Sequence, residues 1–474
     1  MTQTREARPG RRSQADPHEN RGKTPYPTPT PQDDTGSPRV RIAWIIVGSL
    51  AAGLAAAVIL AFAPFGPIDA NVFTGRVLLG FAVGWALLAG LSTWLSDQPQ
   101  RWALAPAAFM GLSGLIMSLG PEALVDRVLG WMWPLALLML VIWIVRRARR
   151  DLHSRTRVFL LYAVLAVLVL FSLGGAYQTI GASLDSPAPA TRGRLIDVGG
   201  HRLHLDCTGS RGPTVVLEPG GGGMSADMEL IAPAVAGDTR VCVYDRPGRG
   251  QSDPVADPQD GAQTATDLHT LLHRGHVPGP YVLAGHSFGG LYVMSFAAQY
   301  PQEVAGMVLV DSTAPSTALV PPKKRAGSYD VLARVSAMTA STARLGVGRL
   351  LGRLNYSTLP PQTRDEARAS AATADYLASY IDEYGFASRS TSQAGELTDL
   401  NGKPLIVLTA GRHPQAWITA QDKMAALSDN SLHRVVAGAT HQSLVADPED
   451  ATSVSQAIHD VVGSVRTSTR LGGR

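Results

Sequence analysis

Five long apolar stretches dominate the first third of the sequence and constrain its fold more than any other feature. None contains a charged residue, and they run over Ile42–Phe62, Val77–Leu95, Trp102–Leu119, Val128–Val145 and Val158–Tyr177. At about 1.5 Å of rise per residue, helices of this length cover roughly 30 Å, the hydrocarbon thickness of a bilayer. We therefore expect about five transmembrane helices within residues 39–180, with buried helices of a soluble core as the less favoured alternative.

The same stretches lack the ionisable side chains that transporters and proton relays place inside the membrane. Anchoring and helix packing are therefore the favoured roles of these helices. Gly80 and Gly84 form a Gly-xxx-Gly pair, a spacing that lets two membrane helices approach closely.

Basic residues are concentrated in the same part of the chain. Residues 1–180 hold 17 Lys and Arg against 10 Asp and Glu, although the whole chain has a net charge of only +4. The basic segments are the N-terminal tail and the link between the last two apolar stretches, and an excess of Lys and Arg marks cytoplasmic segments. This pattern predicts a cytoplasmic N-terminus and an extracytoplasmic C-terminal domain. Because the rest of the chain is nearly neutral, a nucleic-acid partner is not expected.

Two polar segments flank the apolar region. Residues 1–38 are polar, basic and rich in Pro, a composition that predicts a disordered tail. Residues 181–193 form a linker to the remaining domain, residues 194–474. In that domain short β-type runs alternate with helical stretches, which is typical of a parallel sheet covered on both faces. Its first two runs are joined by Gly199-Gly200 and predict an antiparallel hairpin at the sheet edge.

The chemistry of this domain centres on Gly285-His286-Ser287-Phe288-Gly289-Gly290, which follows the β-type run Tyr281-Val282-Leu283-Ala284. A strand, a Gly-x-Ser-x-Gly turn and a helix together present a serine as a nucleophile. On these residues the domain resembles the α/β-hydrolase fold superfamily of serine hydrolases. The resemblance implies a mostly parallel eight-stranded sheet with a helical cap, an attacking Ser287, and no metal or organic cofactor.

Further segments match that superfamily in the order it requires. The run Pro219-Gly220-Gly221-Gly222-Gly223 resembles its oxyanion loop, which implies that the backbone N–H groups of Gly221 and Phe288 bind a developing oxyanion. Asp245-Arg246-Pro247-Gly248-Arg249-Gly250 looks like a supporting turn of the family, and we assign it no catalytic role. His441 follows the last predicted strand, where the family places its general base.

The acid that would orient His441 is less clearly marked. The family usually supplies it after the seventh strand, where this chain has no carboxylate. Some relatives place it after the sixth strand, and there Asp311 is the preferred candidate. Asp422 and Asp429 are the alternatives for the acid, and His413 is a weaker alternative for the base. His286 neighbours the nucleophile but is expected to point away from it.

The resemblance also implies a cap and a possible disulfide. Residues 312–403 lie between the sixth and seventh strands, where the family inserts its cap. Four leucines of this segment are candidates for an apolar acyl-binding wall or for core packing: Leu345, Leu350, Leu351 and Leu354. Cys207 and Cys242 fall on strands that are neighbours in this fold, so either a disulfide or two buried thiols is expected.

Together these features predict a membrane-bound serine hydrolase that cleaves a carboxylic ester through an acyl-enzyme. The expected partners are the lipid bilayer and a small-molecule or lipid-like acyl substrate, and the sequence does not predict an oligomeric state. An acyltransferase or peptidase of the same fold is the nearest alternative. A membrane-anchored binding or signalling module without catalysis is the alternative from a different class.

Overall fold

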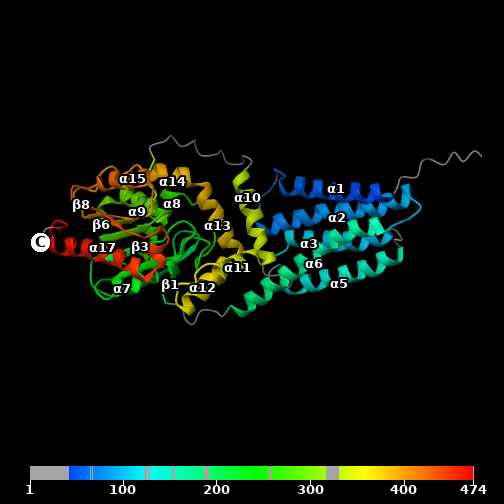
Figure 1. The fold of residues 1–474 in the computed structure, drawn as a ribbon, viewed down its shortest axis with the longest axis horizontal. Coiled ribbons are helices and arrows are strands. Elements are labelled where there is room, and N and C mark those ends of the chain that lie inside the picture. The colour runs from blue at the N-terminus through cyan, green and yellow to red at the C-terminus, as the bar shows by residue number, and fades with distance from the viewer. Residues whose placement is uncertain are drawn as a thin grey trace, which may run out of the picture.

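The computed structural model describes residues 42–472, with the exception of 65, 67, 122–124, 126–128, 152–154, 186–191, 256–258 and 317–329. The Pro-rich tail predicted over residues 1–38 and part of the predicted linker therefore lie outside the described residues. A helical bundle forms one end of the molecule and an α/β domain the other, with the helices α10–α13 between them (Figure 1).

The bundle contains five helices that are long and apolar enough to cross a membrane, counted among the described residues. This confirms the five candidate spans expected from the sequence. The helices are α1 (Ile42–Ala61), α2 (Ala70–Leu95), α3 (Leu104–Leu119), which follows the short η1 (Arg101–Ala103), α5 (Gly130–Asp151) and α6 (Arg155–Leu184).

Several basic residues next to the apolar stretches lie inside these helices, including part of the basic link expected between the last two stretches. Arg76 belongs to α2, because Asp69 caps that helix seven residues earlier and accepts hydrogen bonds from the amides of Asn71 and Val72, both at 2.8 Å. Such a cap satisfies amides that have no partner within the helix, so the helix begins before the apolar stretch does. In the same way, α5 continues through the basic residues 146–150.

Gly80 and Gly84 bring α1 and α2 into close contact. A Cβ atom at Gly80 would lie 2.2 Å from the Cα of Ala57, and one at Gly84 would lie 2.8 Å from the Cα of Gly53. No side chain fits at these distances, so the two backbones pack directly against each other, as small residues permit in membrane helices.

The α/β domain is built on a mixed eight-stranded sheet with the order β1-β2-β4-β3-β5-β6-β7-β8. β2 runs antiparallel to both β1 and β4, and all other neighbours are parallel. The expected eight strands and edge hairpin are therefore confirmed. The strands are β1 (Arg194–Asp197), β2 (Arg202–Thr208), β3 (Thr214–Glu218), β4 (Val241–Tyr244), β5 (Tyr281–His286), β6 (Val304–Val310), β7 (Leu405–Ala410) and β8 (Ser431–Val436).

Helices cover both faces of this sheet and bury its central strands. On one face the core includes Leu271 of α8 (Gly261–Arg274), Phe296 of α9 (Phe288–Gln299) and Met424 of α15 (Gln415–Ala425). On the other face it includes residues of α7 (Ala232–Ala236), α16 (Ser443–Ala446) and α17 (Pro448–Thr467). Burial on both faces explains why β3, β5 and β7 are buried at every position and read as continuous apolar runs.

Five helices of the cap lie between β6 and β7 in the described part of the chain. They are α10 (Val331–Ser341), α11 (Val347–Gly352) after the turn η5 (Thr342–Leu345), α12 (Pro361–Ala371), α13 (Ala374–Gly385) and α14 (Ala387–Ala394). The cap contacts the bundle directly: Arg334 donates to the carbonyl of Ala63 at 2.6 Å, and Ala337 packs with Ala61 and Phe73.

The cap leucines do not behave as the sequence suggested. Leu350, Leu351 and Leu354 are exposed, so they neither pack in a core nor form a covered wall. A six-residue helix that packs on one side only leaves its other side chains outside, which the sequence pattern did not reveal.

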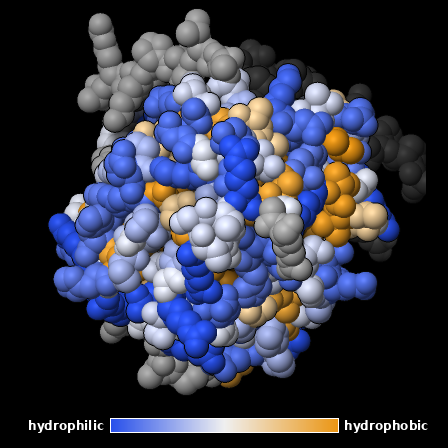
Figure 2. All heavy atoms as spheres, turned by 90° about the vertical axis from the view of Figure 1, so that its left-hand side faces the viewer, coloured by the Kyte–Doolittle hydropathy of each residue, from blue (hydrophilic) through white to orange (hydrophobic). Residues whose placement is uncertain are grey.

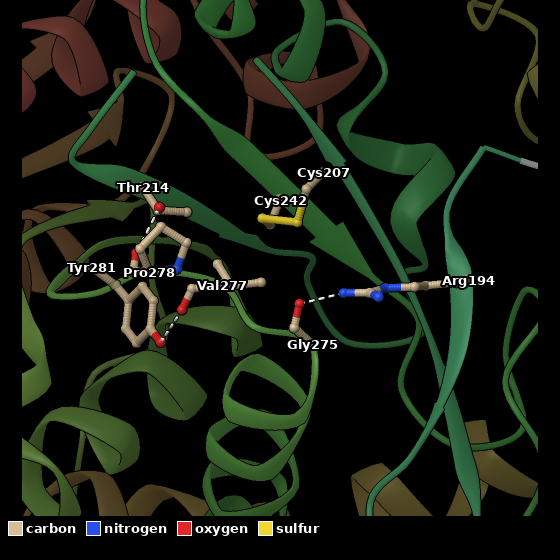
Figure 3. The surroundings of a disulfide bond; sticks show 8 residues. All are labelled: Arg194, Cys207, Thr214, Cys242, Gly275, Val277, Pro278 and Tyr281. Carbon is tan, nitrogen blue, oxygen red and sulfur yellow. Dashed lines mark hydrogen bonds between the residues drawn. A yellow bond between two sulfur atoms is a disulfide. The ribbon is translucent and has the colours of Figure 1, made fainter. Parts of the chain in front are cut away.

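Cys207 and Cys242 are opposite each other on β2 and β4 and form a disulfide (Figure 3).

The end of the α/β domain that faces away from the bundle is mostly hydrophilic, with small apolar areas scattered over it (Figure 2). This contrasts with the bundle, where many large apolar side chains are exposed.

Candidate active site

Ser287 lies on the sharp turn between β5 and α9. Its backbone has φ 55° and ψ −119°, a strained conformation for a residue with a side chain. The turn is possible because its neighbours are glycines. A Cβ at Gly285 would lie 2.5 Å from the carbonyl oxygen of Gly289, and one at Gly289 would lie 2.3 Å from that of Glu218. The sequence pattern therefore holds the hydroxyl of Ser287 at the carboxyl end of the sheet.

His441 lies in the loop after β8 and contacts this hydroxyl. Its Nε2 is 2.9 Å from Ser287 Oγ, and its Nδ1 is 2.6 Å from Asp311 Oδ2. An ionised carboxylate can only accept, so the Nδ1 atom carries the proton and Nε2 is free to accept from the serine. Three side chains from the ends of β5, β6 and β8 thus form one hydrogen-bonded line.

Asp311 is fully buried and accepts from several donors. Besides His441, it accepts from His413 Nε2 at 2.6 Å and from the indole N–H of Trp417 at 2.8 Å. Burial alone would raise the pKa of Asp311, but the hydrogen bonds from His441, Trp417 and His413 outweigh it and hold the pKa below its ordinary value. The carboxylate therefore stays charged next to the imidazole of His441.

The alternative candidates bind other partners. Asp422 lies 2.6 Å from His433, and Asp429 accepts from Arg470 at 3.0 Å. His413 contacts Asp311, and the hydroxyl of Ser287 lies against His441. His413 and Trp417 sit after β7, where the family usually places its acid. The sequence has no carboxylate there, and nothing in its pattern predicted that these two residues would donate to Asp311.

His286 binds the backbone of the loop that carries His441. Its Nε2 lies 3.1 Å from the backbone carbonyl of His441. Burial and the neighbouring imidazole of His441 lower the pKa of His286 to about 4, so His286 is neutral near pH 7. A neutral ring with the proton on Nε2 donates to that carbonyl and fixes the loop that carries His441.

The glycine-rich loop after β3 lies against the serine turn. A Cβ at Gly220 would come 3.2 Å from Ser287 Cβ, and one at Gly221 would come 3.4 Å from Phe288 Cγ and 2.8 Å from the hydroxyl of Tyr384. The backbone of this loop therefore approaches both Ser287 and the cap closely, and only glycine leaves room for that approach.

A buried charged cluster holds this loop in place, and sequence reasoning did not identify it. Arg246 donates to the carbonyls of Pro219 and Gly220 at 2.9 and 2.6 Å and to the carboxylate of Glu218. The second acid is Glu383 of the cap helix α13, whose Oε2 accepts from Arg249 and from the amide of Gly222, both at 2.6 Å. The two arginines and two glutamates balance in charge, as buried ions require.

Nothing near Glu383 in the sequence marks it as part of this cluster. Its partner Arg249 is 134 residues away along the chain. The arginines themselves belong to the Asp245–Gly250 turn, which was expected to support the site structurally. The contact with Gly222 extends that support from the α/β domain to the cap.

Aromatic side chains of α13 cover the loop. Tyr380 and Tyr384 are spaced by one helical turn, with ring centroids 4.9 Å apart, and Tyr384 packs against Phe288 at 5.2 Å. Burial, with the nearby Tyr380 and Glu383, raises the pKa of Tyr384 to about 12, so its hydroxyl remains protonated. The surroundings of the serine on this side are therefore aromatic with polar tips.

Two groups of side chains have ligand atoms close enough for a metal ion, among the residues that the structure describes. One is Asp311, His413 and His441, in which each residue already takes part in the hydrogen bonds described above. The other is His269, His273 and Glu303 on the surface of the α/β domain, away from Ser287.

Comparison with known proteins agrees with this geometry. A sequence profile of the alpha/beta hydrolase fold matches residues 213–448. The fold, the serine turn and the profile define a member of a hydrolase family. The chain belongs to the α/β-hydrolase fold family through this domain, and the family supports a hydrolase in general terms.

Individual relatives are distant and cover only parts of the chain. An uncharacterized protein of Schizosaccharomyces pombe is 29% identical over 225 residues, which are 46% of this chain and 40% of that protein. An uncharacterized vacuolar membrane protein of Saccharomyces cerevisiae is 30% identical over 130 residues, 24% of this chain and 20% of that protein. The chain thus spans less than half the length of these curated relatives.

Solved structures match the α/β domain at low identity. An esterase from Thermogutta terrifontis is 21% identical, with 58% of this chain and 98% of that chain covered and a TM-score of 0.42. A putative lipase from Acinetobacter baumannii is 18% identical, with 62% and 98% covered and a TM-score of 0.45. These likenesses concern the fold alone.

Proposed function

We propose that the protein is a membrane-embedded serine hydrolase that cleaves carboxylic esters. One observation carries the proposal: Ser287 Oγ lies 2.9 Å from His441 Nε2, and His441 Nδ1 lies 2.6 Å from the buried carboxylate of Asp311. A serine hydroxyl is a weak nucleophile unless a base takes its proton, and this arrangement provides the base and the group that orients it.

In the proposed reaction, Ser287 attacks the carbonyl carbon of the ester while its proton moves to His441. The charge on the carbonyl oxygen is stabilised by the backbone N–H groups of Gly221 and Phe288; Phe288 directly follows the serine, and Gly221 lies against Phe288. His441 then gives its proton to the leaving alcohol, and an acyl-enzyme remains on Ser287. A water molecule, activated by His441, releases the acid.

A serine in this position also narrows the reaction class. Relatives of this fold that open epoxides or displace halide attack with a carboxylate, whereas this turn carries Ser287. An acyltransferase would replace the water by another acceptor, and a peptidase would release an amine. Both alternatives share the first step, so the choice between them depends on the second substrate and the leaving group.

The membrane setting favours a lipid-like ester. The cap that covers the glycine loop also contacts the bundle, through Arg334 with Ala63 and through Ala337 with Phe73. The cap thus links the site to the bundle, which supports a substrate that arrives from the bilayer surface.

The charge distribution supports an extracytoplasmic α/β domain. The C-terminal end of α1 faces the cap, as the contact of Ala63 shows, so its N-terminal end and the basic end of α5 (residues 146–150) lie at the opposite end of the bundle. By the excess of Lys and Arg at that end, we infer that it is cytoplasmic.

Labelling with a fluorophosphonate probe tests the proposed nucleophile in the purified full chain. We expect the wild type and Ser388→Ala, which changes an exposed serine of the cap, to be labelled, and Ser287→Ala to be unlabelled. Hydrolysis of esters of graded chain length then tests the substrate class. A folded wild type that neither reacts with the probe nor hydrolyses any ester would overturn the proposal in favour of a non-catalytic binding module.

A further inference from the structure

The cap helix α11 and the turn after it expose an apolar surface that the catalytic geometry does not use. It consists of four side chains: Val347 is 38% exposed, Leu350 59%, Leu351 52% and Leu354 77%. A short helix with this many large aliphatic side chains outside is unusual for a surface that faces water. We call these four residues the apolar face of α11.

The other side of α11 packs within the cap. Gly348 and Gly352 are buried and lie against α12, since a Cβ at Gly348 would come 2.7 Å from the carbonyl oxygen of Ala371 and one at Gly352 would come 3.6 Å from that of Arg368. Residues four apart share one side of a helix, so the apolar face of α11 points away from α12. In Figure 1, α12 lies farther from the bundle than α11 does.

Helix α11 is fastened to the end of the transmembrane helix α6. Arg349 forms two hydrogen bonds with the carboxylate of Asp185, at 2.6 and 3.0 Å, and its Nε lies 3.3 Å from Gln178 Oε1. The guanidinium of Arg353 lies over the ring of Tyr177, 5.2 Å from its centroid. These contacts fix α11 beside the C-terminal end of α6 and Asp185, the residue that follows it.

The bundle shows at which depth this contact lies. Thr179 of α6 donates to the carbonyl of Gly130, the first residue of α5, at 2.8 Å. The next residue, Trp131, is 51% exposed. Tryptophan and tyrosine are enriched where membrane helices meet the headgroups, so Trp131 and Tyr177 mark the interface at this end of the bundle. Helix α11 lies at the same level.

We propose that the apolar face of α11 is seated in the interfacial layer of the bilayer that holds the five spans, with Arg349 and Arg353 on its polar side. On the neighbouring end of α6, Ile180 and Leu184 are also exposed, at 50% and 74%. Amphipathic segments bind bilayers in this way, with aliphatic side chains at the acyl boundary and basic side chains near the phosphates. The proposal rests on the proposed membrane function but not on catalysis.

This placement would fix the depth of the cap and bring lipid close to the site. The chain that leaves α11 reaches Leu359, which packs with Met224 and Ala367. Met224 directly follows the glycine loop. Packed apolar side chains thus join the stretch after α11 to the end of the glycine loop, and the substrate class that follows is an acyl lipid of the adjoining leaflet.

Spin labelling of the full chain in phosphatidylcholine nanodiscs tests the seating directly. Nitroxides are attached to Leu351→Cys and, separately, to Leu354→Cys. The matched control is Val435→Cys, which is 50% exposed on β8 at the far end of the α/β domain. Cys207 and Cys242 are joined to each other and take no label.

We expect the labels at 351 and 354 to collide several-fold more often with oxygen, which concentrates in the bilayer, than with a water-soluble nickel chelate. The label at 435 should show the reverse. If one of the two α11 variants does not fold, the other variant tests the proposal. Labels on α11 that are as accessible to the nickel chelate as the label at 435 would overturn the proposal. Because this readout does not involve activity, an inactive protein leaves it intact.

Discussion

The carboxylate of Glu383, on the cap helix α13, accepts a hydrogen bond from the backbone amide of Gly222, with 2.6 Å between Oε2 and N. The same carboxylate accepts from Arg249 at 2.6 Å and from the hydroxyl of Tyr292 at 2.8 Å, and it pairs with Arg246 at 3.2 Å. A cap residue thus holds the loop that carries the proposed oxyanion site. The position of the cap and the shape of that loop are therefore coupled.

Glu383→Gln should damage both stability and reactivity. The change keeps the size of the side chain but leaves Arg246 and Arg249 buried without their counter-charge, and breaking a buried pair in this way costs about 3–5 kcal/mol. We also expect labelling of Ser287 by a fluorophosphonate to slow by about tenfold, because a displaced N–H donor stabilises the transition state less well. Thermal unfolding in detergent and labelling rates measure the two effects.

Tyr292→Phe is the matched control, because it removes one donor to Glu383 and leaves all charges in place. Its cost should be about 1.5–3 kcal/mol, the range of a single hydrogen bond to a charged group. Equal melting temperatures and labelling rates in Glu383→Gln and the wild type would mean that the loop is held without this carboxylate.

The charge of Glu383 also predicts a pH dependence of stability. Burial would raise its pKa, but Arg249, Arg246 and the amide of Gly222 outweigh burial and lower the pKa from 4.5 to about 2. A carboxyl whose folded pKa is depressed stabilises the fold above its unfolded pKa and loses that contribution as the pH falls. The advantage of the wild type over Glu383→Gln should therefore be full at pH 6 and shrink between pH 4.5 and 2.

The difference between the two proteins isolates Glu383 from the other acids of the region. Burial raises the pKa of Asp227 from 3.8 to about 6. The effect of Asp227 therefore has the opposite sign: its contribution to the stability of the fold decreases as the pH rises from 3.8 to about 6. Asp227 is present in both proteins and cancels in the comparison. A stability difference that stays constant from pH 6 to 3 would show that Glu383 does not carry the depressed pKa.

Local sequence patterns predicted most of the sheet but only part of the candidate active site. The continuous apolar runs and the serine turn are short-range signals, and the eight strands follow them. The role of Glu383 could not be predicted, because its partners come from distant segments of the chain. In the sequence, a single Glu on a cap helix looks the same as a solvent-exposed one. The basic residues 146–150 were expected in a link, but α5 continues through them, because a basic side chain at a helix end does not by itself stop the helix. The exposed side of α11 reflects packing on one side only, which apolar content does not reveal.

Asp311→Asn tests which acid orients His441. The amide cannot hold the proton of His441 on Nδ1 as a carboxylate does, and in serine proteases the comparable change lowers kcat about 10⁴-fold. We expect a loss of at least about 10³-fold in ester hydrolysis, on the same grounds. Asp422→Asn is the control, since Asp422 is exposed and pairs with His433. Similar losses in both variants, or none in Asp311→Asn, would contradict the assignment.

The disulfide between Cys207 and Cys242 links stability to the proposed orientation. It closes a loop with a sequence separation of 35, which corresponds to about 4 kcal/mol in the chain-entropy description. Cys207→Ala with Cys242→Ala should lower the melting temperature, and a reductant should have no further effect on that variant. Mass spectrometry of denatured, unreduced wild type should find the two cysteines joined. Two free thiols would argue that the domain lies in a reducing compartment.

The contact between α1 and α2 predicts an unusual cost for adding a single methyl group. Gly80→Ala would place a Cβ 2.2 Å from the Cα of Ala57, and neither backbone can yield without separating the helices. Overpacking of this kind costs about 1–3 kcal/mol. Gly90→Ala is the control on the same helix, because a Cβ there has no neighbour within 4 Å. In thermal unfolding in detergent, the melting temperature of Gly80→Ala should be well below that of the wild type, and that of Gly90→Ala should equal it. Equal melting temperatures for the two variants would mean that α1 and α2 do not pack through their glycines.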